Sequence, residues 1–574
     1  MKKRLLTLIL VFICPILLFA NYQKYYEVSS LEWRLVSWLT KYAGVTGPSS
    51  NGPVTGYQLK DAIDRAEKKL GKDNEYIIEA REALAGPEPV IGERDSGYGF
   101  FRVAVTPEVY LQTNGIEPGT FDGGNTIYDS DWFVGDSQER SPLFDIEIEF
   151  GVKDIAYATF DYNFTRSYYA SDTWSKNFLH NISFDHTENY PYRAGISIGN
   201  ENLSFIAAKA GVSMGEGYTG NTAIGDNFDY QEFVKAGFFS PNVSLFLNIT
   251  NFDSSHSRDI QNPFKFSYPA FSEYLQLRHC VSMDINILDR GLFSVSLINL
   301  LDTTSSFDLR MINPLYILHN MFNNKERTIF ESNNMLFVSL SIPIVPKVSA
   351  HFQYTMDQSQ SKKEIESVTE YIDPNAFSLL FNLSYSDSTR SGRYELVGEV
   401  VYNSPCMYLN QKYFKDGDRI TDIIPLSDPV YAWSQDFLVG YFNQNETNGN
   451  AGWSGYYHGP DSIVTAIGGT YCGGKYELSG RIFYMAHGEK GRGDKAENYT
   501  FDGYNTADTV SDYSLSGIIE HSLVLSLEGD YSFSDYLSIH SGFAYSYQWN
   551  YRNQKGENRN NLQCVLGFKV KAGV

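Results

Sequence analysis

Two different periodicities divide the chain. From residue 97 to the C-terminus, apolar residues alternate with polar ones, as in segments 144–150, 281–287, 348–356 and 562–570. Such a period of two predicts β-strands with one apolar and one polar face. We count roughly 18 to 20 segments of this kind, many of them about ten residues long, which is the length that a tilted membrane strand needs.

The segment before these strands follows a helical period instead. Two pairs of residues have the spacing of a capping box: Ser29 with Glu32, and Thr55 with Gln58. In a capping box, each of the two side chains accepts a hydrogen bond from the backbone N–H of the other residue at the start of a helix. Apolar residues at helical spacing follow both pairs. A third helix is predicted over about residues 74–85. Because three short helices bury little by themselves, we expect them to pack against the strands.

The first residues have the pattern of a secretory signal peptide. Three basic residues precede an apolar stretch that closes at Ala20. We therefore expect a signal peptide over 1–20, a helical periplasmic cap and linker over 21–96, and a transmembrane β-barrel over 97–574. Such a chain leaves the cytoplasm.

Strand length and loop pattern favour a membrane barrel. Short turns alternate with long polar loops, and after the leader no apolar run approaches the ~18–20 residues of a spanning helix. The predicted fold class is all-β: an outer-membrane antiparallel β-barrel of about 18 strands with a small N-terminal helical bundle. The alternative, a secreted stack of β-sandwiches, would need repeats or linkers, and the sequence has neither.

Composition narrows the partners and the chemistry. Aromatic residues make up 15% of the chain, which is ample apolar surface for a folded core and excludes disorder. The net charge of −22 disfavours nucleic acid and anionic headgroups as partners. The five cysteines are far apart and form no CxxC pair, so we predict no metal and no cofactor.

Several segments carry a resemblance to a known family. They are Gly215-Glu216-Gly217-Tyr218-Thr219-Gly220-Asn221, Ser306-Phe307-Asp308-Leu309-Arg310, Ile312-Asn313-Pro314-Leu315 and Gly459-Pro460-Asp461. Their order, over about residues 29–571, resembles the Wzi-like capsule-assembly proteins, although Asn403 replaces a threonine of that pattern. The resemblance implies an 18-stranded barrel with a helical bundle at its periplasmic end. It also implies noncatalytic binding or organisation of capsule-like polysaccharide at the cell surface.

The candidate ligand-binding residues are placed in the lumen or at its rim. They are Asp308, Arg310, Asn313, His319 and Arg278. Arginine and asparagine side chains can hold sugar hydroxyls or carboxylates through forked hydrogen bonds. Asp308 and Arg310 are two residues apart, so on a strand both face the lumen. An internal Asp308–Arg310 pair that plugs the lumen is the favoured interpretation, and a structural role is also favoured for Arg278.

Three functions remain open at this stage. The first is a noncatalytic outer-membrane barrel, in a diderm bacterium, with surface polysaccharide and outer-membrane lipid as partners. The alternative is a porin or substrate-specific channel for small solutes, in which acidic groups would favour cations. A hydrolase is disfavoured, because the chain has no G-x-S-x-G elbow and His487-Gly488-Glu489 is expected to be a solvated loop. An anionic polysaccharide would need a basic patch or bridging Ca²⁺.

Overall fold

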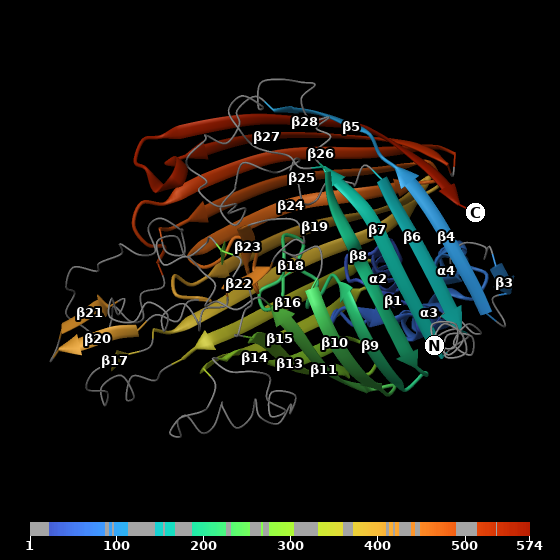
Figure 1. Cartoon of the computed structure of the whole chain (residues 1–574), viewed down its shortest axis with the longest axis horizontal. Helices are drawn as coiled ribbons and strands as arrows, with labels where there is room; N and C mark the ends of the chain where they lie inside the picture. The colour runs from blue at the N-terminus through green and yellow to red at the C-terminus, as the bar shows by residue number, and fades with distance from the viewer. Residues whose placement is uncertain are drawn as a thin grey trace, which may run out of the picture.

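The structure is a computed structural model of the whole chain (Figure 1). It describes residues 22–85, 91–93, 97–112, 144–152, 155–166, 186–225, 231–252, 266–267, 275–303, 331–359, 371–372, 374–408, 412–416, 419–423, 438–441, 448–489, 514–534 and 536–573. Among these residues, no helix is long and apolar enough to cross a membrane.

Three α-helices near the N-terminus confirm the predicted helical bundle. They are α2 (Leu31–Ala43), α3 (Gly56–Leu70) and α4 (Glu75–Ala85). The predicted capping box of α3 is present, with the Thr55 backbone N–H donating to Gln58 Oε1 at 2.9 Å. The helices share an apolar core in which Leu39, Leu59 and Ile63 are fully buried. Their apolar stripes thus face one another as the periodicity predicts.

The predicted capping box of α2 is wrong by one residue. Ser30, not Ser29, is the N-cap, and its Oγ accepts a hydrogen bond from the Trp33 backbone N–H at 3.3 Å. Ser30 has an extended backbone and the helix begins at Leu31, so Ser29 lies one position too early to reach the first turn.

Antiparallel strands form the rest of the fold. The barrel strands are β4 (Gly97–Val105), β5 (Glu108–Gln112), β6 (Phe144–Val152), β7 (Ala156–Arg166), β8 (His186–Gly199), β9 (Leu203–Ala210), β10 (Gln231–Phe239), β11 (Val243–Phe252), β13 (Leu275–Asn286), β14 (Leu292–Thr303), β15 (Glu331–Val345), β16 (Val348–Gln358), β18 (Ala376–Thr389), β19 (Gly392–Asn403), β24 (Ser462–Gly473), β25 (Tyr476–His487), β26 (Glu520–Ser534), β27 (Leu537–Trp549) and β28 (Asn558–Gly573). The shorter strands are β1 (Tyr25–Tyr26), β2 (Val54–Thr55), β3 (Ile91–Glu93), β12 (Phe266–Ser267), β17 (Tyr371–Ile372), β20 (Lys412–Asp416), β21 (Arg419–Ile423), β22 (Leu438–Tyr441) and β23 (Asn448–Trp453).

The sheet closes on itself through its first and last long strands. β28 pairs with β27 on one edge and with β4 and β5 on the other, through Val570 opposite Val105 and Gln563 opposite Gln112. β4 and β5 share one position, because both pair with β28 and only Thr106 and Pro107 separate them. The described strands therefore make a closed antiparallel barrel of 18 positions, and the predicted fold class is confirmed.

Side chains alternate between the lumen and the outer surface. In β10, Phe233 and Lys235 point inward and are 4% and 2% exposed, whereas Val234 and Phe238 point outward and are 42% and 46% exposed. The same pattern places apolar residues such as Phe381 and Ile467 on the outside of other strands. An apolar outer surface and a polar interior are typical of membrane barrels.

The tight turns lie at one end of the barrel, which we call the short-turn end. Turns such as 199–203, 286–292 and 473–476 connect strands there. The helices lie inside this mouth of the barrel (Figure 1). Trp38 Nε1 of α2 donates to the Tyr394 carbonyl of β19 at 3.0 Å, and Thr46 Oγ1 donates to Asn286 Oδ1 at 3.1 Å. The expected packing of the helices against the strands is thus observed.

Candidate functional site

The predicted ligand cluster falls largely outside the described residues. Asp308, Arg310, Asn313 and His319 belong to the segment 304–330, which the structure does not describe. Arg278 is described, and it lies in β13 with its side chain in the lumen and 1% exposed.

Arg278 is held by neutral groups. Its Nη1 donates to Ser454 Oγ at 3.0 Å, and its Nη2 donates to Thr250 Oγ1 at 3.3 Å and to Gln231 Oε1. The guanidinium also lies over the Phe252 ring, 5.1 Å from its centroid. The guanidinium thus joins three barrel strands to the segment around Ser454, and this geometry favours a structural function for Arg278.

His487 is buried, so the expectation of a solvated loop is wrong. It is 2% exposed, and its ring nitrogens lie 2.8 Å from the Gly488 carbonyl and 2.9 Å from the His458 carbonyl. Glu489 accepts a hydrogen bond from the Ile518 backbone N–H at 3.2 Å. These contacts give both His487 and Glu489 structural partners.

The glycine-rich segment 215–221 lies inside the barrel, against inward-facing side chains of the wall. It belongs to the connection 211–230 between β9 and β10, and we call the described part of this connection, 211–225, the inward loop. Met214 in this loop bridges to Asn51 of the N-terminal segment and to Ile224. Asn221 and Thr222 are 3% and 0% exposed. The loop thus runs through the barrel interior, and sequence reasoning identified the segment without predicting that position.

Polar side chains of the barrel wall fix the inward loop. Glu399 of β19 accepts hydrogen bonds from the Tyr218 N–H at 2.6 Å and from the N–H and hydroxyl of Thr219 at 2.8 and 2.6 Å. Gln353 of β16 accepts from the N–H and hydroxyl of Thr222, both at 2.9 Å. Buried polar groups need such partners, and charge-assisted bonds to a carboxylate are the stronger kind. The loop is therefore a fixed part of the barrel.

The glycines of the motif are required by close approach. A Cβ added at Gly217 would lie 1.8 Å from the Gly220 carbonyl oxygen. One added at Gly215, where φ is +123°, would lie 2.2 Å from Gln353 Nε2. Only glycine fits at these two positions.

An ion network joins the inward loop to α2 and to the wall. Lys41 Nζ lies 2.9 Å from Glu395 Oε1 and 3.7 Å from Glu216 Oε2. Ser341 donates to Glu216 Oε1 at 2.7 Å, and the Glu216 N–H donates to His351 Nε2 at 3.2 Å. Burial opposes the charged form of both Lys41 and Glu216, but the attraction of Lys41 to Glu395 and Glu216, together with the hydrogen bonds, outweighs it. The pKa of Lys41 is therefore raised and that of Glu216 is lowered.

A cavity of about 280 Å³ lies between α2, the inward loop and the strands β18, β19 and β24. We call it the lumen cavity. Its lining includes two aromatic residues, two amides and both signs of charge: Trp33, Tyr218, Asn221, Asn382, Arg34, Lys41, Glu216 and Glu395. Amide and charged groups hydrogen-bond hydroxyls, and aromatic rings cover apolar faces. This combination suits a polar, ring-shaped ligand such as a sugar.

On β26, the inward-facing side chains are exposed near the short-turn end and buried further along. The inward-facing Glu528 and Asp530 of β26 are exposed, whereas Ser522 of the same strand is fully buried. On the neighbouring strand, Ser546 and Gln548 are 2% and 0% exposed. Along this wall, then, solvent enters the described barrel from the short-turn end and does not reach the level of Ser522.

The lumen cavity could not be read from the sequence. Its residues come from segments separated by more than a hundred positions, such as Trp33, Glu216 and Asn382. The one local signal was the glycine spacing of 215–221, because a loop that approaches other backbone closely needs glycine.

Comparisons with known proteins show the fold. No family model and no curated protein matches the chain. The solved structure of Wzi from Escherichia coli, an outer-membrane protein involved in group 1 capsule assembly, aligns over 96% of this chain and 99% of its own length, with 11% identity and a TM-score of 0.53. DcaP of Acinetobacter baumannii aligns over 85% of this chain and 99% of its own, with 10% identity and a TM-score of 0.34. OprD of Pseudomonas aeruginosa aligns over 83% and 95%, with 10% identity and a TM-score of 0.37. The chain thus has the fold of an outer-membrane β-barrel.

Proposed function

We propose that this chain is a noncatalytic outer-membrane barrel that binds or organises surface polysaccharide. The observation that carries the proposal is the lumen cavity, which is walled by aromatic, amide and charged side chains. The inward loop beside it is anchored by Glu399 and Gln353, so the site is preorganised. Wzi, which shares the fold, is described as a carbohydrate-binding β-barrel. Because a shared fold does not determine function, the proposal depends mainly on the side chains that line the lumen cavity.

The location and orientation are part of the same proposal. We infer that the leader over 1–20 directs secretion and that 97–574 spans the outer membrane, an inference that the apolar outer surface of the described strands supports. Short turns face the periplasm in bacterial barrels of this kind. The helices α2 to α4, which lie at the short-turn end, then form a cap on the periplasmic side.

Oligosaccharide binding tests the proposal directly. The probe is polysaccharide sheared from the surface of the producing cells, titrated into the purified barrel in detergent. Tyr218→Ala and Arg34→Ala change two cavity side chains and should each weaken binding about tenfold, which is about 1.4 kcal/mol. Arg390→Ala, at an exposed turn outside the cavity, is the matched control and should bind normally. Binding that both cavity variants retain would contradict the proposal.

The channel alternative predicts a different measurement. A porin of this size would conduct large steady ion currents in planar bilayers, and the exposed Glu528 and Asp530 would make those currents cation-selective. Because the side chain of Ser522 is fully buried, we expect no measurable ion current through the barrel instead.

The noncatalytic assignment has its own test. The oligosaccharide should be recovered uncleaved after incubation with the protein, and its hydrolysis would overturn that assignment.

A further inference from the structure

Solvent reaches the charged side chains that line the lumen cavity. The side chain of Arg34 is 49% exposed, and those of Lys41 and Glu395 are 19% and 24% exposed. Further along β19 and β24, the inward-facing Glu399 and Ser462 are buried. Along these two strands the cavity is therefore open toward the short-turn end, and a ligand that enters there contacts the charged groups.

Each cation of the lining already faces an acid. Lys41 Nζ lies 2.9 Å from Glu395 Oε1 and 3.7 Å from Glu216 Oε2. Arg34 Nη1 lies 3.5 Å from Glu477 Oε1 on β25. The described lining has no other charged side chain, so with Glu477 two cations face three acids.

The charged groups around this set keep the excess of acids. Around Tyr218 and Arg34 there are two further cations and three further acids: Arg393, Arg481, Glu79, Glu399 and Glu528. Arg393 is paired with Glu79 and is therefore not free to bind a ligand.

A carboxylate in the lumen cavity cannot escape the acids of its lining. A cavity of about 280 Å³ is about 8 Å across, which does not exceed the Debye length of ~8 Å at physiological ionic strength. A ligand carboxylate would therefore be repelled by Glu216 and Glu395 wherever it lay, and to bind Arg34 it would have to compete with Glu477. Such like-charge contacts exclude the wrong partner.

Paired charges can still bind hydroxyl groups. A carboxylate has about four lone-pair sites and an ammonium has three donors, so the pair of Lys41 and Glu395 keeps capacity for sugar hydroxyls. Thr470 of β24 adds a half-buried hydroxyl. The Tyr218 side chain lies against β24, because a Cβ added at Gly468 would be 1.9 Å from its hydroxyl oxygen. Its ring can cover the apolar face of a sugar.

We propose that the lumen cavity binds an uncharged sugar residue of the surface polysaccharide and excludes carboxylated sugars. The inference rests on the proposed function and names the chemical class of its ligand. The sugar hydroxyls bind Lys41, Glu395 and Thr470, and the sugar ring lies on Tyr218. The volume, at the lower limit of small-molecule sites, suits one or two sugar residues.

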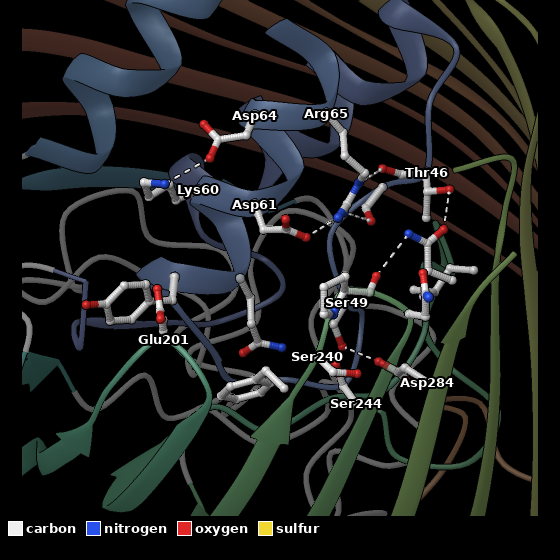
Figure 2. Close-up of a pocket in the computed structure, with 18 of the residues that line it drawn as sticks. Thr46, Ser49, Lys60, Asp61, Asp64, Arg65, Glu201, Ser240, Ser244 and Asp284 are labelled. Carbon is white, nitrogen blue, oxygen red and sulfur yellow. Dashed lines mark hydrogen bonds and ion pairs between the residues drawn. The ribbon is translucent and has the colours of Figure 1, made fainter. Parts of the chain in front are cut away.

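A second cavity at the short-turn end supplies a control position. It also has a volume of about 280 Å³, and it shares no lining residue with the lumen cavity. It lies between α3 and the turns that follow β8, β10 and β13, and in it Ser49 Oγ donates to Asp284 Oδ2 at 2.6 Å (Figure 2). Glu201 lines this second cavity and is exposed (Figure 2). A change at Glu201 therefore alters the charge of the protein outside the lumen cavity.

Chemical conversion of one polysaccharide gives two matched probes. Polysaccharide sheared from the producing cells is reduced, which turns its carboxylates into primary alcohols. Part of this product is then oxidised, which turns primary alcohols into carboxylates. Calorimetric titration into the purified barrel in detergent at neutral pH should show at least tenfold tighter binding of the reduced form. In about 1 M salt, where the Debye length is ~3 Å, the difference should become smaller.

The outcomes separate this inference from the proposed function. Equal or tighter binding of the oxidised form, or a difference that salt leaves unchanged, overturns the inference and leaves polysaccharide binding standing. Binding of neither form contradicts the proposed function, and this inference with it.

Two variants test the residues. Glu395→Gln removes an acid beside Lys41, and Glu477→Gln removes the acid beside Arg34, so in each the preference for the reduced form should fall at least fivefold. The ratio of the two affinities is the measurement, because a purely structural defect weakens both forms alike. Glu201→Gln is the control and should keep the native ratio within twofold. A native ratio in both cavity variants overturns the inference.

Discussion

Lys41 and Glu395 form an ion pair of 2.9 Å although 354 residues separate them along the chain. The same ammonium lies 3.7 Å from Glu216 of the inward loop. One side chain of α2 thus holds together three parts of the protein: the helices, the loop that runs through the lumen and the wall of the barrel.

Removing the ammonium should loosen the helices. Lys41→Met leaves Glu216 and Glu395 as neighbouring acids without their counter-ion, and we expect it to lower the free energy of unfolding by about 1–3 kcal/mol. The double variant Lys41→Met with Glu395→Gln should lose less than the sum of the single losses, since the pair is then removed as a unit. Urea unfolding of the purified barrel measures both.

A matched control is Lys60 on α3, whose ion pair with Asp64 is more exposed, while Asp64 keeps a second partner in Arg81. Losing this pair in Lys60→Met should cost no more than about 0.5 kcal/mol. If Lys41→Met lowers the free energy of unfolding no more than this control does, the contacts of Lys41 with the loop and the wall do not stabilise the protein.

Acid should release the inward loop from the helices. The pKa of Glu216 is lowered in the folded protein, so its contribution to stability is full above its ordinary value of 4.5 and is lost as the pH falls through the folded value. Lys41 has a raised pKa and contributes fully below 10.5, so it keeps its charge in this range. Glu395 of β19 and His351 of β16 are the other charged or titratable groups around Glu216.

Fluorescence of Trp33 and Trp38 should report this release. We expect a change of environment below about pH 4.5 in the native protein. In Glu216→Gln the same transition should be smaller, since the titrating group has gone. An unchanged acid transition in that variant would assign the effect to other carboxylates.

Gly217 should not tolerate a side chain. A Cβ there meets the Gly220 carbonyl oxygen at 1.8 Å, so Gly217→Ala must displace the inward loop, at a cost of about 2–3 kcal/mol in the free energy of unfolding. Gly398→Ala is the control, because its Cβ meets nothing within 4 Å and should change stability by less than about 0.5 kcal/mol. Thermal unfolding compares them, and equal stability of the two variants would contradict the assignment.

The two serines before α2 should differ. Ser30→Ala removes the cap on the Trp33 N–H and should cost about 1 kcal/mol, whereas Ser29→Ala should cost less than about 0.5 kcal/mol. Hydrogen exchange at the Trp33 amide reads the cap directly: it should become faster in Ser30→Ala and stay unchanged in Ser29→Ala. The reverse order would restore Ser29 as the cap.

The strands could be predicted because their alternation is a local signal. Segment 144–150 is typical: Glu149 points into the lumen, where Lys24 binds it at 2.7 Å, and Phe150 points outward and is 43% exposed. The helix start at Ser30 was missed by one residue, since two adjacent serines offer nearly the same local energy and only the backbone path decides between them.

The cavities could not be predicted, because nothing local marks them. Asp284 follows the same alternation as any other inward residue of β13, and its hydrogen bond from Ser49 depends on where the N-terminal segment lies. Arg278 was expected to face the lumen, but its neutral partners, among them Ser454 and Thr250, come from separate segments. The alternation along one strand predicts which way a side chain points, but it does not predict which groups from other segments that side chain contacts.

The anchoring of the N-terminal segment also sets an order of assembly. Its contacts reach Glu149 on β6, Asp284 on β13, Glu395 on β19 and Glu477 on β25. These strands are made one after another, and the last of them emerges some 400 residues after the helices. The part of the chain that is synthesised first therefore has no complete place to dock until nearly all of the barrel exists. The N-terminal segment must therefore stay undocked until the barrel strands that bind it have formed.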